Sequence, residues 1–168
     1  FEKKLIFSGD PSRFPHIVDW KHSTPLHVYA TRAEGVDYSK VHLEGWRTQQ
    51  ELLLELSKGG GFGLVWGNSE NPAEERDYYK ENVSYKLTTY LAAGIPVVVP
   101  DYLSNVDYIR EKGLGFVVSS LEEASRVVQE CTEEEYDQMV TRAKYTAYLI
   151  KNGYFTKKLF IDSMMLLD

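Results

Sequence analysis

The chain has 168 residues, of which 43% are hydrophobic and 26% are charged, and its net charge is −6 at pH 7. This length and composition fit one soluble globular domain, and the acidic balance without a basic run argues against sequence-independent nucleic-acid binding. No apolar run approaches the ~20 residues that span a bilayer, no signal peptide opens the chain and the single cysteine forms no internal disulfide, so a cytoplasmic protein is expected.

In chain order, short apolar runs bounded by turn residues alternate with segments of helical spacing. The runs predict strands at Lys4–Phe7, Leu26–Ala30, Val41–Leu43, Phe62–Trp66, Val97–Val99 and Gly115–Val118. Helices are predicted over Phe14–Trp20, Thr48–Gly59 and Ser104–Gly113, after Asn82, and from Ser120 and Thr132 onward, with a break at Asn152-Gly153. The expected fold class is α/β: a single Rossmann-like, doubly wound parallel sheet of about six strands, with helices on both faces.

A polar stretch precedes the most informative motif of the chain. The residues from Gly67 to Glu81 include Pro72 and many charges, and they predict a surface loop. Glu74, Glu75 and Asp77 form a charge run within it, and such runs are usually solvated.

The motif itself runs from Asn82 to Pro100 and predicts a helix, a stop at Gly94 and a strand buried on both faces. Asn82 is a favourable N-cap residue, and Lys86 falls in the first turns of the helix. A lysine there is unfavourable beside the positive end of the helix dipole unless an anion lies opposite. We therefore expect Asn82 and Lys86 to bind an anion such as phosphate; the alternative is a plain cap with a solvent-facing lysine.

Two other loops follow predicted strands, where doubly wound folds bind ligands. After the first strand, Gly9 would let the backbone approach a ligand and Arg13 could bind a diphosphate, the alternative being an ordinary turn. After the third strand, Trp46 either offers a surface for stacking a base or only covers the core. The glycines at Gly59–Gly61 precede a strand and lack the lysine of a phosphate loop, so they predict a helix stop.

No motif predicts a metal site or a covalent mechanism. The 4 histidines lack metal-ligand spacing, and there is no Cys-His cluster for zinc. The Gly-x-Ser-x-Gly elbow of α/β-hydrolases is missing, and no pair of carboxylates suggests a general acid and base. No cofactor is expected, and the sequence does not identify catalytic residues.

Three pieces of the chain, in the same order, resemble the C-terminal, donor-binding domain of GT-B glycosyltransferases, a family with bacterial galactofuranosyl- and glucosyltransferases among its members. The pieces are Ile6–Gly9 with Arg13, Val41–Trp46 followed by Glu51-Leu52, and Lys86–Val98, which is similar to the pattern Lys-Leu … Tyr-Leu-Ala-x-Gly-x-Pro-Val-Val. The resemblance covers nearly all of residues 1–168. It implies one half of a metal-independent enzyme that moves a hexose from a nucleotide sugar, commonly a UDP-sugar, to a glycan or glycoprotein.

The resemblance also implies roles for single residues. Arg13 and Lys86 would neutralise the diphosphate, Asn82 and the neighbouring helix amides would bind phosphate, and Trp46 would lie against the base. Many members of the family carry a ribose-binding glutamate where this chain has Thr89, so the ribose contact is expected to differ here.

GT-B enzymes have two domains, and the resemblance covers only the second. The acceptor site and any catalytic base are expected on an N-terminal domain outside this chain, and the chain alone would be inactive. Without that domain the helices after Thr132 would expose an apolar patch containing Tyr148, Tyr154, Phe155 and Phe160, and a homo-oligomer is a further expectation.

Two other functions compete with this one. A non-catalytic nucleotide-binding or assembly module would use the same fold. A nucleotide-sugar epimerase or synthetase would need the glycine-rich dinucleotide fingerprint after the first strand, and Ser8–Pro11 does not supply it.

Overall fold

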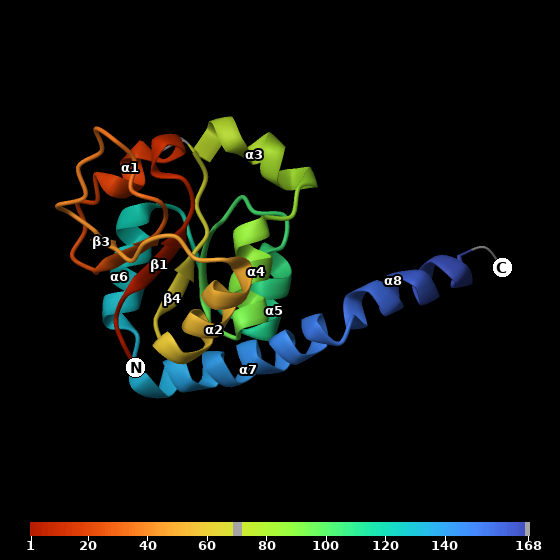
Figure 1. Ribbon diagram of the computed structural model, residues 1–168. Coiled ribbons are helices and arrows are strands. Elements are labelled where there is room, and N and C mark those ends of the chain that lie inside the picture. The colour runs from red at the N-terminus through yellow and green to blue at the C-terminus, as the bar shows by residue number, and fades with distance from the viewer. Residues whose placement is uncertain (69–71, 167–168) are drawn as a thin grey trace.

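The computed structural model describes residues 1–68 and 72–166, which fold around one parallel sheet (Figure 1). The strand order is β3-β2-β1-β4-β5-β6 in a 6-stranded sheet. The strands are β1 (Leu5–Ser8), β2 (Leu26–Tyr29), β3 (His42–Leu43), β4 (Phe62–Leu64), β5 (Val97–Pro100) and β6 (Gly115–Val118). Because the order reverses between β1 and β4, the two halves of the sheet wind in opposite directions. The expected doubly wound α/β fold is confirmed.

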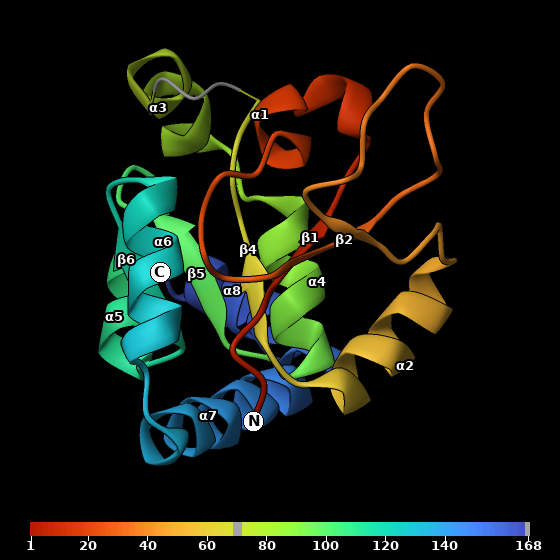
Figure 2. The same ribbon diagram turned by 90° about the vertical axis from the view of Figure 1, so that its left-hand side faces the viewer.

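Helices connect the strands and cover both faces of the sheet (Figure 2). They are the 3-10 helix η1 (Pro11–Arg13), α1 (Pro15–Val18), α2 (Gln49–Gly59), α3 (Pro72–Glu81), α4 (Tyr85–Ala93), α5 (Val106–Lys112), α6 (Leu121–Glu130), α7 (Glu133–Lys151) and α8 (Tyr154–Met165). Alternate residues of β1 point to opposite faces. Leu5 and Phe7 belong to the core beneath α1 and α6, whereas Ile6 belongs to the core beneath α2, α4 and α5.

The predicted helix boundaries follow from their caps. Thr48 accepts a hydrogen bond from the Glu51 amide, and the Glu51 carboxylate accepts one from the Thr48 amide, which completes a capping box at the start of α2. Thr132 begins α7 in the same way. Gly94 ends α4 at φ 78°, a conformation that favours glycine, so β5 can follow after a short turn.

The stretch predicted as a polar loop before Asn82 is mostly the helix α3, so that prediction is wrong. Proline is tolerated in a first helical turn, and glutamate, arginine and lysine favour helix. The segment has few apolar residues to reveal a helical period; Tyr79, 9% exposed, turns inward. α3 lies over the edge of the sheet at which the strands end (Figure 1).

The last two helices leave the body of the domain. α7 packs against α4 beneath the sheet, and the predicted break at Asn152-Gly153 is confirmed, with Gly153 at φ 67°. Beyond it α8 extends away from the sheet (Figure 1), and none of its described residues is buried. Among the residues described, no helix has both the length and the apolar character that crossing a membrane requires.

Candidate functional site

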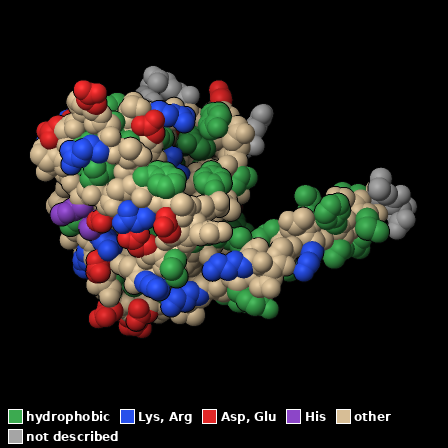
Figure 3. All heavy atoms as spheres, in the orientation of Figure 1, with side chains coloured by type: hydrophobic (Ala, Val, Ile, Leu, Met, Phe, Trp, Pro, Cys, Tyr) green, Lys and Arg blue, Asp and Glu red, His purple; other side chains and the backbone are tan. Residues whose placement is uncertain are grey.

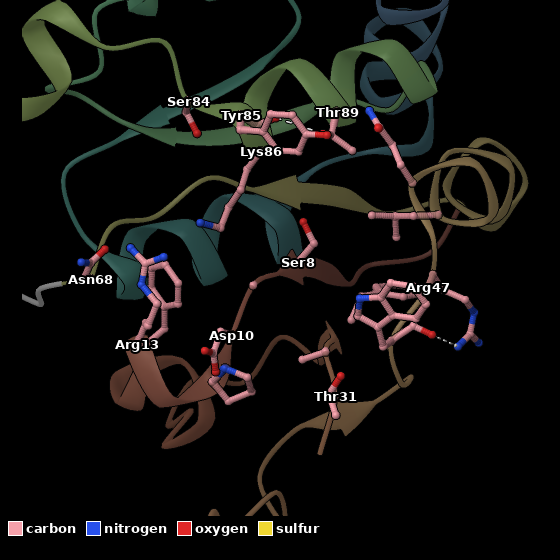
Figure 4. Close-up of a pocket in the computed structure, with 18 of the residues that line it drawn as sticks. Ser8, Asp10, Arg13, Thr31, Arg47, Asn68, Ser84, Tyr85, Lys86 and Thr89 are labelled. Carbon is pink, nitrogen blue, oxygen red and sulfur yellow. Dashed lines mark hydrogen bonds between the residues drawn. The ribbon is translucent and has the colours of Figure 1, made fainter. Parts of the chain in front are cut away.

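A cavity of about 1160 Å³ opens at the carboxyl edge of the sheet (Figure 4). The loops after β1, β2, β3 and β4 contribute to its walls together with α3 and the first turns of α4. Five residues singled out in the sequence line it: Gly9, Arg13, Trp46, Lys86 and Thr89. The structure therefore gathers them at the place where doubly wound sheets bind ligands, beside the reversal of strand order.

Asn82 does not line this cavity. α4 begins at Tyr85 and its N-cap residue is Ser84, so the prediction that Asn82 caps this helix is wrong. Instead, Asn82 Nδ2 donates a hydrogen bond of 2.9 Å to the carbonyl oxygen of Tyr78, one of the last carbonyls of α3. Asparagine and serine are both favourable N-cap residues. Asn82 lies directly after α3, a helix that the sequence did not predict, and its side chain bonds to that helix.

Lys86 reaches from the first turn of α4 into the cavity (Figure 4). Its Nζ lies 4.3 Å from the centre of the Phe14 ring and 5.0 Å from that of Phe7, so two aromatic faces hold the ammonium group. Burial lowers the pKa of Lys86 to about 8; the charge of Arg13 also lowers it, and that of Glu75 opposes both. A partly desolvated cation of this kind in a cavity is suited to bind an anion.

Arg13 and Gly9 complete this end of the cavity. Arg13 ends η1, and its guanidinium carbon lies 5.9 Å from the centre of the Phe14 ring, on which Lys86 also rests. A Cβ added at Gly9 would come within 2.9 Å of the Phe7 ring and 3.3 Å of Lys86 Cε. Glycine therefore leaves the space through which the lysine side chain passes, in addition to any approach of the backbone to a ligand.

Trp46 lines the same cavity from the loop after β3. Its side chain is 64% exposed, which overturns the alternative that it only covers the core. The neighbouring Arg47 is held by Glu55, with 2.7 Å between Nε and Oε2, and lies at the end of the cavity away from Arg13 (Figure 4). The cavity thus joins a cationic end to an end that offers an exposed aromatic surface.

Thr89 lies between these ends on α4 and is buried. Its hydroxyl donates a hydrogen bond of 3.0 Å to the carbonyl oxygen of Tyr85. The hydroxyl hydrogen is therefore used within the helix, and what remains for a ligand is the acceptor capacity of the oxygen.

Sequence reasoning missed Glu75, which it placed in a solvated charge run. Glu75 lies in the lining of the cavity, and its carboxylate accepts a hydrogen bond from the Asn68 amide. Asn68 lies in the connection that follows β4, so the rule that ligands bind after parallel strands was a signal that could have directed attention to this loop. Among the side chains that the structure describes, no three of histidine, cysteine or acidic type gather as metal ligands would.

The comparison with known proteins agrees with the resemblance seen in the sequence. The family described as "Glucosyltransferase 3-like, C-terminal domain" matches residues 5–163. "Glucosyltransferase 3" of Streptococcus gordonii is 54% identical over 98% of this chain and 49% of its own length, and "Glucosyltransferase 3" of Streptococcus parasanguinis is 35% identical over 97% and 48%. "Beta-1,6-galactofuranosyltransferase WbbI" of Escherichia coli (strain K12) is 26% identical over 92% and 47%.

The chain spans about half the length of these bacterial relatives. The family match covers nearly all of the chain, and its description confirms the expectation of a C-terminal glycosyltransferase domain. The chain belongs to the glucosyltransferase 3-like C-terminal domain family.

Proposed function

We propose that this chain is the donor-binding half of a glycosyltransferase that moves a hexose of the glucose or galactose type from a UDP-sugar to a glycan or glycoprotein. One observation carries the proposal: Arg13 and Lys86 lie together at one end of a single cavity, and the exposed ring of Trp46 lines the same cavity. A nucleoside diphosphate has the matching parts, two phosphates at one end and a flat base at the other.

The cations supply the chemistry that such a transfer needs. Negative charge accumulates on the diphosphate as the bond to the sugar breaks, and fixed positive groups in a partly desolvated cavity stabilise that charge most in the transition state. Arg13 can bind phosphate oxygens through two N–H groups, and Lys86 acts as a point charge. The UDP-sugar is the substrate in this proposal, and the transfer is proposed to need neither a metal ion nor a cofactor.

The other half of the reaction is assigned to an N-terminal domain of the same protein. We place the acceptor site and the catalytic groups there, in the cytoplasm, and expect this chain alone to be inactive. The apolar side chains that stand along α8 support this assignment (Figure 3), since Leu159, Phe160 and Met164 are each at least 66% exposed. An N-terminal half seated on α8 would bury them.

Titration of the chain with UDP and UDP-glucose by calorimetry tests the binding claim. We expect saturable binding, and we expect Lys86→Ala to weaken it by roughly 10- to 100-fold because a charge-assisted contact is lost. Lys58→Ala is the matched control, because Lys58 is exposed at the end of α2 and does not line the cavity. Failure to bind at millimolar ligand, or equal loss in both variants, would reject the proposal.

A non-catalytic nucleotide-binding module is the second candidate, and the use of the Thr89 hydroxyl within α4 favours it. The test is to join the chain to its natural N-terminal region and measure sugar transfer from UDP-glucose. Transfer that is lost with Lys86→Ala excludes the module, whereas nucleotide binding without transfer to glycan acceptors supports it.

A further inference from the structure

Glu75 brings a carboxylate from α3 down to the edge of the sheet. Its Oε1 accepts a hydrogen bond of 2.5 Å from the Asn68 amide, and its Oε2 accepts one of 3.4 Å from the Tyr102 hydroxyl. Asn68 lies in the connection after β4, and Tyr102 follows β5. One side chain therefore connects α3 to the ends of two neighbouring strands.

The space that this carboxylate fills is left open by Gly67. A Cβ added at Gly67 would overlap the carboxyl group of Glu75. Gly67 is not among the glycines at positive φ, so its backbone does not itself demand glycine. Glycine at position 67 is therefore explained by the space that the Glu75 carboxyl group occupies.

Other described contacts also join α3 to the segment that follows β5. The Ser104 amide donates to the Tyr79 carbonyl oxygen at 3.1 Å, Arg76 lies 3.6 Å from Asp101, and the rings of Tyr79 and Tyr102 lie 5.9 Å apart. The Arg76 pair is exposed, and exposed pairs contribute little to stability. Glu75 and Tyr79 thus attach α3 to the segments that follow β4 and β5.

The same carboxylate acts on the cations of the cavity. Glu75, Arg13 and Lys86 line one cavity, and the charge of Glu75 raises the pKa of Lys86 against the effects of burial and Arg13. Figure 4 shows Lys86 and Arg13 extending toward the end of the cavity at which Asn68, the partner of Glu75, lies. An anionic ligand at this end would meet a negative group of the protein beside the cations that it needs.

We propose that Glu75 is an internal counter-ion to Lys86 and Arg13 that holds α3 over the cavity in the ligand-free protein. A bound diphosphate would replace Glu75 beside these cations and so loosen α3. The claim that the diphosphate belongs to a nucleotide rests on the proposed function, whereas the exchange of one anion for another does not. Docking of α3 and binding of a diphosphate then oppose each other, so each weakens the other by the same free energy. The apparent affinity for the ligand is reduced by the fraction of molecules in which Glu75 is docked.

Two variants release the carboxylate in different ways. Glu75→Gln removes its charge. Gly67→Ala keeps the charge but puts a methyl group where the carboxyl group lies. Glu130→Gln is the control, since Glu130 is an exposed glutamate at the end of α6 and outside the cavity. Calorimetry with inorganic pyrophosphate and with UDP, and hydrogen exchange of the α3 amides, would be measured for each protein.

We expect Glu75→Gln to bind pyrophosphate roughly 5- to 10-fold more tightly than the wild type. Gly67→Ala is expected to change the affinity in the same direction and Glu130→Gln not at all. Amide exchange in α3 should be faster in both release variants, and faster in the wild type when pyrophosphate is added. These results support the inference even if UDP binds no more tightly than pyrophosphate. That outcome would count against binding of a nucleotide and leave the counter-ion role of Glu75 standing.

Equal or weaker pyrophosphate binding by Glu75→Gln would overturn the inference, as would a lack of pyrophosphate binding in every protein. Slower α3 exchange on adding the ligand would also overturn it, because α3 would then be tightened and not released. Saturable UDP binding that is the same in the wild type and Glu75→Gln would leave the proposed function standing and reject the counter-ion.

Discussion

The ammonium nitrogen of Lys86 lies 4.3 Å from the centre of the Phe14 ring. Phe14 is buried against Phe7, with the two ring centres 5.0 Å apart, and directly follows the short helix that ends at Arg13. The segment after β1 therefore supplies Arg13 to the cavity and also orients Lys86, which comes from α4. Together these segments form a single cationic wall whose charge depends on Lys86.

Binding of UDP-glucose should weaken as the pH rises through the pKa of Lys86. In the free protein this pKa is about 8, so the ammonium form that attracts a diphosphate is lost above pH 8. We expect the affinity to fall roughly 10-fold between pH 7 and pH 9. Calorimetry across this range checks it. A profile as steep in Lys86→Ala as in the wild type would assign the titration to another group.

Replacing Lys86 with methionine should stabilise the ligand-free chain at pH 7. The pKa of Lys86 is lowered in the folded state from 10.5 to about 8, so folding disfavours its charged form at pH 7 and this penalty is relieved between pH 8 and pH 10.5. Methionine removes the penalty, with a gain on the order of 1 to 3 kcal/mol in the free energy of unfolding. Urea denaturation at pH 7 and pH 9.5 measures it. A larger gain at pH 9.5 than at pH 7 would show that burial does not disfavour the charged lysine.

Truncation of Trp46 should weaken nucleotide binding without destabilising the domain. The ring is 64% exposed, so little core packing is lost, whereas stacking on a base contributes about 1 to 3 kcal/mol. We expect Trp46→Ala to lower the affinity for UDP roughly 10-fold and to leave that for pyrophosphate unchanged. Tyr145→Ala, an exposed aromatic change on α7, is the control. Parallel losses for UDP and pyrophosphate would show that Trp46 does not contact the base.

Tyr90→Phe should destabilise the junction between α4 and the end of β1. The Tyr90 hydroxyl, on a fully buried side chain, accepts a hydrogen bond of 2.9 Å from the Ser8 amide, and burial raises the pKa of Tyr90 to about 12. Phenylalanine keeps the ring against β4 but leaves the amide without this acceptor. We expect a loss of about 1 to 2 kcal/mol in the free energy of unfolding. An unchanged denaturation midpoint would indicate that another group accepts from Ser8.

The sheet and half of the cavity could be predicted because they depend on local patterns. Apolar runs such as Val97–Val99 mark buried parallel strands, and the loops after those strands must meet at one edge of the sheet. Lys86 and Trp46 follow from this rule, because each lies in or beside such a loop and both line the cavity.

The rest depends on contacts between segments that the sequence does not pair. α3 has too few apolar residues to show a period, and Glu75 acquires its partners only when α3 folds over β4 and β5. The sequence does not separate Asn82 from Ser84, two residues later, as the start of α4, because asparagine and serine are both favourable N-cap residues.

The contact between Lys86 and the diphosphate of a nucleotide is the basis of the proposed function, and a comparison of UDP with uridine in the wild type and in Lys86→Ala isolates it. We predict that the wild type binds UDP far more tightly than uridine, and that Lys86→Ala reduces this ratio by roughly 10-fold or more, because the lost contact is with phosphate alone. A ratio that is the same in both proteins would contradict the proposal, since Lys86 would then make no contact with the diphosphate.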